Sequence, residues 1–149
     1  MTTRSGRSSN GGRKKIPKFK LSKRSLSRLE GVHPDLLRVV HAAIQATPVD
    51  FTVLEGLRTR ERQAELLEAG ATRTMNSRHL TGHAVDLGAY VAGKVRWDWP
   101  PYYRIADAVK TAAVGEGILI EWGGDWSTFK DGPHWQLPWS DYPIEGGDA

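Results

Sequence analysis

The chain has 149 residues, a length that suits one domain with a single core. It contains no cysteine, which excludes disulfides and thiolate metal sites, and no apolar run approaches the length of a membrane span or of a signal-peptide core. The formal net charge is +4, and 39% hydrophobic with 26% charged residues is the composition of an ordinary soluble globular domain.

The positive charge is concentrated at the amino end. Residues 1–24 contain nine basic and no acidic side chains, and removing these nine from the 21 basic residues leaves 12 against 17 acidic, a balance of −5. Residues 1–18 have almost no apolar side chains, so we expect a disordered basic tail. Such a tail either only aids solubility or binds anionic envelope polymers. No aromatic residues interleave with its charges, which argues against specific nucleic-acid binding.

Two helices are expected in the first third of the chain. A short one covers residues 21–29, opening at Ser22 or Ser25 and ending at Gly31. The next begins at His33-Pro34, because proline suits a first helical turn. Its apolar residues recur at helical spacing: Leu36, Leu37, Val39, Val40, Ala43 and Ile44. We expect His33 and His41 to be structural, as a cap and a solvent-side position.

A strand is predicted at Phe51–Leu54 by its β-branched and aromatic residues. Thr59 can then cap a helix that continues past Gln63 and stops at Gly70. Arg58 therefore lies at a strand-to-helix junction, where it either reaches into a site or forms a surface ion pair. Residues 71–77 are expected to form a loop.

Further elements follow from residue 78 onward. We expect a hairpin with Gly93 in its turn and then a helix from Tyr103 to Val114 that ends at Gly115 and Gly117. Ile118–Trp122 has the clearest strand pattern. A further strand is predicted at His134–Leu137, with His134 and Gln136 on one face. Trp97, Trp99, Tyr102 and Tyr103 are dense enough to indicate a core or its rim; stacking on sugars is the alternative, which requires exposure.

These elements predict an α+β fold, a small antiparallel sheet with two or three helices packed on it. Residues 19–138 would form the domain. Residues 139–149, rich in Pro, Gly and acidic side chains, would be a loose tail. We expect a monomer.

Three side chains could hold a catalytic metal. His79, Asp86 and His134 would supply nitrogen and oxygen ligands and leave a position open, as catalytic zinc requires. Asp131 is then free to act as general base and proton donor. His83 follows His79 by four residues, a spacing that would pair them on a helix. Gly82 and the apolar run after it favour a turn and strand instead, so His83 is interpreted as a neighbour of the site.

The pattern Ser77-x-His79-x-x-Gly82-x-Ala84-x-Asp86 with Asp131-x-x-His134 resembles the zinc peptidases that include D-Ala-D-Ala carboxypeptidases and dipeptidases. It is most similar to the branch of phage endolysins that cut the L-alanyl-D-glutamate bond of peptidoglycan. The resemblance runs from about Phe19 to Leu137 and includes Glu55-Gly56-Leu57-Arg58-x-x-Glu61-x-Gln63.

The resemblance implies a zinc-dependent lysis protein that accumulates in the host bacterial cytoplasm and is released through a holin lesion. It also implies that Arg58 binds and polarises the substrate carbonyl. Ser77, a polar residue next to His79, could hold substrate or orient a ligand. The peptidoglycan stem peptide would be the substrate. A D-Ala-D-Ala carboxypeptidase remains an alternative, for which Arg78 could supply a carboxylate-binding cation. A non-catalytic, zinc-stabilised module that binds cell wall or polyanions is the alternative from another class.

Overall fold

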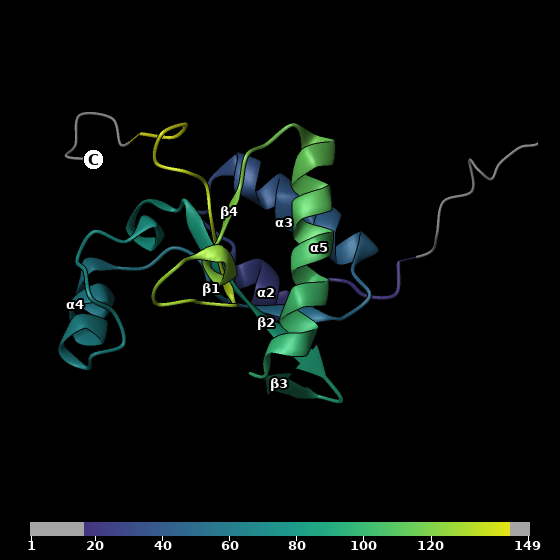
Figure 1. The fold of residues 1–149 in the computed structure, drawn as a ribbon, viewed down its shortest axis with the longest axis horizontal. Helices are drawn as coiled ribbons and strands as arrows, with labels where there is room; N and C mark the ends of the chain where they lie inside the picture. The colour runs from purple at the N-terminus through teal and green to yellow at the C-terminus, as the bar shows by residue number, and fades with distance from the viewer. Residues whose placement is uncertain (1–16, 144–149) are drawn as a thin grey trace, which may run out of the picture.

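The computed structural model describes residues 17–143. Within these residues, four helices accompany a five-stranded antiparallel sheet with the strand order β1-β2-β5-β4, and β3 pairs with β2 outside this path (Figure 1). The predicted α+β fold is confirmed. The helices are α2 (Lys23–Arg28), α3 (Pro34–Ala46), α4 (Arg60–Glu68) and α5 (Trp99–Glu116), and the strands are β1 (Phe51–Glu55), β2 (Ala84–Val91), β3 (Lys94–Arg96), β4 (Glu121–Trp122) and β5 (His134–Gln136). Two short 3₁₀ helices are η1 (Arg78–Thr81) and η2 (Gly123–Asp125).

The core lies between the sheet and the pair α3 and α5, which pack against each other, while α4 stands apart from them (Figure 1). On β2, Val85, Leu87 and Ala89 are buried in this core, whereas Asp86 points to the opposite face. A strand alternates its faces at every residue, so one strand serves both the core and a polar site.

Predicted helix starts agree with the observed caps. Ser22 accepts a hydrogen bond at the start of α2, His33 Nδ1 accepts one from the amide of Asp35, and Thr59 caps α4. Side chains that satisfy free amide groups in a first turn are local signals, which explains why the sequence locates them.

Two predicted boundaries were wrong. The strand expected over residues 118–122 is reduced to Glu121–Trp122, because only these two pair with β5, while Leu119 is exposed. The helix expected over residues 103–114 is longer at both ends. Helix α5 starts at Trp99 and continues through Gly115 to Glu116, and Gly117 follows it in the left-handed conformation. Two prolines occupy its first turn, where no intrahelical amide donor is needed.

The ordered chain continues past residue 138. Arg78 donates to the carbonyls of Pro138 and Tyr142, and the Tyr142 hydroxyl donates to Asp35 on α3. Within the segment expected to be loose, residues 139–143 are thus held against the body. Residues 144–149, and residues 1–16 of the expected basic tail, lie outside the described residues. No helix in the described part of the chain is long and apolar enough to cross a membrane.

Candidate metal centre

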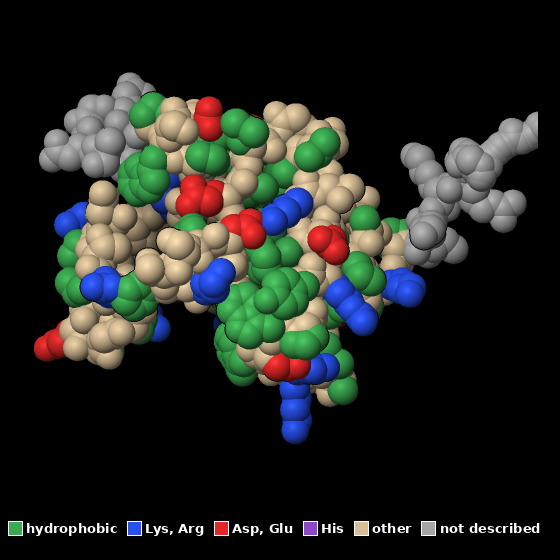
Figure 2. All heavy atoms as spheres, in the orientation of Figure 1, with side chains coloured by type: hydrophobic (Ala, Val, Ile, Leu, Met, Phe, Trp, Pro, Cys, Tyr) green, Lys and Arg blue, Asp and Glu red, His purple; other side chains and the backbone are tan. Residues whose placement is uncertain are grey.

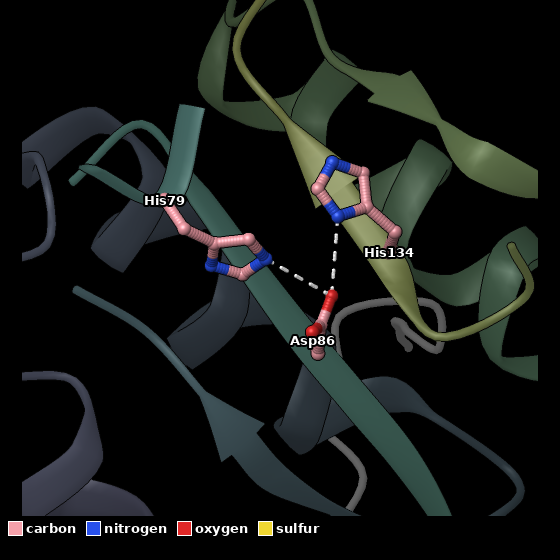
Figure 3. Close-up of side chains that lie close together, drawn as sticks. All are labelled: His79, Asp86 and His134. Carbon is pink, nitrogen blue, oxygen red and sulfur yellow. Dashed lines mark hydrogen bonds and ion pairs between the residues drawn. The ribbon is translucent and has the colours of Figure 1, made fainter. Parts of the chain in front are cut away.

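Two imidazoles and a carboxylate converge on the polar side of the sheet (Figure 3). Asp86 Oδ1 lies 3.3 Å from His79 Nε2 and 3.1 Å from His134 Nδ1. The candidate ligand atoms all lie within 4.8 Å of one another, and no other group of three His, Asp or Glu side chains in residues 17–143 meets this condition. Two nitrogens and one oxygen form a donor set that suits zinc and other divalent transition metals.

Local structure explains why these three side chains meet. Asp86 and His134 are direct partners in the β2–β5 register, and directly opposed residues project from the same face of a sheet. His79 lies on η1, whose first turn is capped by the Ser77 hydroxyl, which accepts from the His79 amide at 3.1 Å. Gly82, with a φ of 78°, then turns the chain from η1 into β2.

Each histidine has its second nitrogen bound to an oxygen. His79 Nδ1 lies 2.8 Å from the carbonyl oxygen of Gly56, and His134 Nε2 lies 2.8 Å from Oε1 of Gln136. These oxygens are acceptors, so both nitrogens carry the proton and donate it. The remaining nitrogen of each ring lies within hydrogen-bond distance of Asp86, and on losing its proton it offers a lone pair of the kind that metal coordination requires.

The two carboxyl groups of the site have opposite electrostatic environments. Burial alone would raise the pKa of Asp86, but hydrogen bonds with His134 and His79 outweigh it and hold that pKa far below its usual range. Burial and then the negative charge of Asp86 raise the pKa of Asp131. Burial likewise opposes the charge on His134, but its bond with Asp86 raises its pKa. Asp86 is thus held ionised, whereas Asp131 holds a proton more readily.

Arg58 does not form a surface ion pair, because its side chain is only 9% exposed. Its Nη2 donates to Glu55 at 2.6 Å and lies 3.7 Å from Asp86 Oδ2, while Nη1 donates to Gln63 at 2.8 Å. A bulge between Val53 and Glu55 bends β1 where it meets Asp86. Buried Gln63 also donates to the carbonyl of Thr74 at 2.6 Å and so links α4 to the following loop.

All six residues singled out by the sequence line one cleft of about 400 Å³. They are Arg58, Ser77, His79, Asp86, Asp131 and His134. The rim includes Trp126, whose ring centre lies 5.2 Å from that of His134, and Trp139, which packs against the guanidinium of Arg78.

Gly123 gives the Asp131 segment the space to approach His134. The Asp131 amide donates to the Gly123 carbonyl, and a Cβ at Gly123 would lie 2.4 Å from the carbonyl oxygen of Asp131. Two other acidic residues that could compete for the role of general base have partners elsewhere. Glu121 accepts from Trp126, and Asp125 pairs with Lys110.

His83 and His33 are not part of the group formed by His79, Asp86 and His134. The His83 ring lies beside that of His33, with ring centres 5.1 Å apart and planes inclined by 37°, and it contacts the Thr81 hydroxyl. Arg78 is buried, and three of its bonds go to the carbonyls of residues 137, 138 and 142. It anchors the carboxyl-terminal segment, and it also lines the cleft, where its Nη1 has no hydrogen-bond partner among the described residues.

Sequence reasoning did not assign roles to Gln63 and Gln136. Both are buried amides that bind a site residue, and such polar groups need a partner when they leave water. For Gln136 a signal existed, since it follows His134 by two residues and so shares its strand face. For Gln63 the contact with Arg58 depends on how α4 packs against the strand end.

The chain is similar to known peptidases in sequence and in fold. The model of the phage L-alanyl-D-glutamate peptidase family matches residues 17–136. The L-alanyl-D-glutamate peptidase of Escherichia phage T5 is 32% identical over 117 residues, which cover 76% of this chain and 85% of that protein. The peptidase of the same description from Listeria phage A118 is 36% identical over 101 residues, covering 68% of this chain and 35% of that longer protein.

Among solved structures, the crystal structure of the L-Ala D-Glu endopeptidase ChiX from Serratia marcescens superposes with a TM-score of 0.80. It is 52% identical to this chain, and the match covers 85% of this chain and 96% of that one. Family match, sequence identity and fold therefore agree: this chain belongs to the family of phage L-alanyl-D-glutamate peptidases.

Proposed function

We propose that this protein is a zinc-dependent endopeptidase that hydrolyses the L-alanyl-D-glutamate bond of the peptidoglycan stem peptide. The observation that carries the proposal is the convergence of His79, Asp86 and His134 in one cleft with Asp131 and Arg58, in a chain of this family.

His79, Asp86 and His134 would hold the metal. The outward hydrogen bonds of the two imidazoles support this assignment, because they occupy the outer nitrogen of each ring and leave the nitrogen that faces Asp86 as the one that can coordinate a metal. Bound zinc would act as a Lewis acid that makes water more acidic and polarises a carbonyl group. Three protein ligands leave a position open for this chemistry.

Asp131 would move the proton. In our proposal its carboxylate accepts a proton from the attacking water and later donates it to the leaving amine of D-glutamate. The raised pKa of Asp131, beside an Asp86 that stays ionised, suits this division of roles between two nearby carboxyl groups.

Arg58 would stabilise the negative charge that develops on the substrate carbonyl oxygen. Its buried guanidinium is oriented by Glu55 and Gln63, so no reorganisation is needed during the reaction. Ser77 lies on the cleft wall, and we propose that it contacts the substrate as well as capping η1.

The test is mass spectrometry of the soluble products released from purified peptidoglycan. We expect peptides that begin with D-glutamate, lost after chelation and recovered with added zinc. Release of D-alanine alone would instead identify a carboxypeptidase, and absence of any product would favour a binding module without turnover.

A variant pair tests the assignment of the proton carrier. Asp131→Asn should bind zinc with unchanged stoichiometry and lose product release by a factor of about 10² or more. Asp125→Asn, the matched control on the surface, should behave as the unmodified protein. If Asp131→Asn loses zinc, Asp131 is a ligand and the assignment is wrong.

We also propose that the protein acts on the wall from inside the host, after a holin opens the membrane. Its kinship with peptidases of Escherichia and Listeria phages supports this proposal. Expression in a bacterial host should cause lysis only when the membrane is permeabilised; lysis without permeabilisation would contradict it.

A further inference from the structure

An exposed group of aromatic side chains lies at the amino end of α5. Trp97, Trp99 and Tyr103 are 67%, 37% and 55% exposed, and hydrophobic side chains gather over this end of α5 beside β3 (Figure 2). We call these three residues the aromatic platform. The sequence indicated that the four aromatic residues between 97 and 103 form a core or its rim. Only Tyr102 among the four is buried, and its hydroxyl donates to the carbonyl of Arg96. The exposure that sugar stacking requires is therefore present.

Two of the three platform rings, Trp99 and Tyr103, are rigidly supported. Trp99 and Tyr103 are one helical turn apart, with ring centres 5.7 Å apart and planes inclined by only 30°. Both rings meet Trp122 edge-on, and Trp122 is stacked on buried Trp135 at 5.6 Å. Rings held in this way lose little conformational entropy when a ligand binds.

The platform packs against the chain segment that follows Asp131, a residue of the cleft wall. Gly132, which follows Asp131, packs against Trp99, since a Cβ there would lie 3.3 Å from the Trp99 ring. The Trp122 indole also donates to the Gly132 carbonyl at 2.7 Å. One short segment therefore separates the proposed proton carrier from the exposed rings.

The chemistry of peptidoglycan requires a sugar near the bond that is cut. The L-alanine of the stem peptide is joined through a lactyl group to an amino sugar, so the glycan lies one residue from the bond to be cut. An extended residue spans about 3.5 Å. The glycan must then pass over surface that borders the cleft.

We propose that the aromatic platform binds pyranose rings of the glycan strand. The C–H faces of a pyranose pack on aromatic rings, and its hydroxyls need polar neighbours, which the exposed ion pair of Arg96 with Asp98 provides beside Trp97 and Trp99. This inference rests on the proposed function, because it assigns the glycan part of the same substrate.

The test measures binding and cleavage separately. Binding is followed by NMR titration with a soluble hexamer of N-acetylglucosamine, and cleavage with a free stem peptide that carries no sugar. The double variant Trp97→Ala/Tyr103→Ala should weaken hexamer binding about tenfold, a few-fold for each ring, and leave peptide cleavage unchanged. These two residues are the most exposed of the three, and thermal unfolding checks that the fold is intact.

Two matched variants make the test specific. Tyr103→Phe keeps the ring and should bind the hexamer as the unmodified protein does. Tyr90→Ala removes an exposed ring from β2, beside Lys20 and Ser22, and should also have no effect.

The proposal is overturned if the unmodified protein does not bind the hexamer, if the double variant binds it equally well, or if Tyr90→Ala weakens binding as much. It is also overturned if sedimentation shows a dimer that the double variant abolishes, because the platform would then join two copies of the chain. Hexamer binding without cleavage of either the free peptide or purified peptidoglycan would refute the proposed function alone, and cleavage without hexamer binding would refute the platform alone.

Discussion

The two histidines of the candidate metal centre present different nitrogens to Asp86, Nε2 in His79 and Nδ1 in His134. The difference follows from their outer partners, a main-chain carbonyl for His79 and the Gln136 side chain for His134. Only the second partner can be removed by mutation.

Replacing Gln136 with Leu should weaken zinc binding by about 10- to 100-fold, because the His134 ring loses the acceptor that sets its tautomer and orientation. Competition with a chromophoric chelator measures the affinity. Gln45→Leu, an exposed amide on α3, is the matched control. Equal zinc affinity of the Gln136→Leu variant and the control would show that Gln136 does not orient the ligand.

At the scale of elements, the turn between η1 and β2 decides whether His79 can face Asp86. Gly82 and Gly70 share a φ of 78°, but their surroundings differ. A Cβ at Gly82 would lie 2.3 Å from the carbonyl oxygen of Gly31, whereas a Cβ at Gly70 would meet nothing within 4 Å.

Gly70→Ala should therefore cost only the left-handed backbone conformation, about 1–2 kcal/mol of unfolding free energy. Gly82→Ala should cost more, because the main chain of Gly31 must also move, and zinc affinity should fall with it. Urea unfolding measures both variants. If they lose the same stability, the close approach of Gly82 to Gly31 is unimportant.

The Tyr142–Asp35 hydrogen bond joins the carboxyl-terminal segment to α3 at 2.7 Å. This bond lowers the pKa of Asp35 and raises that of Tyr142 to about 12. The Asp35 contribution to stability is full above its ordinary pKa of 3.8 and is lost as the pH falls through the lowered value. The Tyr142 contribution is full below pH 10.0 and is lost as the pH rises through about 12.

Tyr142→Phe should therefore be less stable by about 0.5–1.5 kcal/mol near neutral pH, the usual net contribution of a hydrogen bond. The difference from the unmodified protein should shrink at both pH extremes. Chemical unfolding at a series of pH values tests this expectation, and a difference that is constant with pH would contradict it.

At the scale of the whole molecule, charge is divided between the amino-terminal residues and the rest. Residues 1–16 contain five basic and no acidic side chains, so subtracting five from the net +4 leaves −1 for residues 17–149. The catalytic part by itself has no excess of positive charge with which to approach anionic envelope polymers.

Removing residues 1–16 should weaken binding to lipoteichoic acid or lipopolysaccharide about tenfold at low salt and flatten its salt dependence. Cleavage of a soluble stem peptide should not change. A full-length variant with Gln at the five basic positions separates charge from length and should match the truncated chain. A steep salt dependence for DNA, lost in the same variants, would instead indicate nucleic-acid binding.

The sequence by itself determined the features that depend on near neighbours. Ser22, His33 and Thr59 mark the helix starts because a cap acts within one turn, and alternation on β2 separates Asp86 from the core side chains. Motif spacing together with the family resemblance pointed to the six residues that line the cleft, and their individual roles remain predictions.

Only the tertiary structure decided features that depend on distant partners. The strand predicted at residues 118–122 pairs over two residues because β5 opposes no more of it. Arg78 meets carbonyls some 60 positions away, Gln63 reaches Arg58 from α4, and the platform rings are exposed because no element covers them within the described part of the chain. Local patterns specify which face of an element is apolar, but long-range packing decides which polar groups that element will meet.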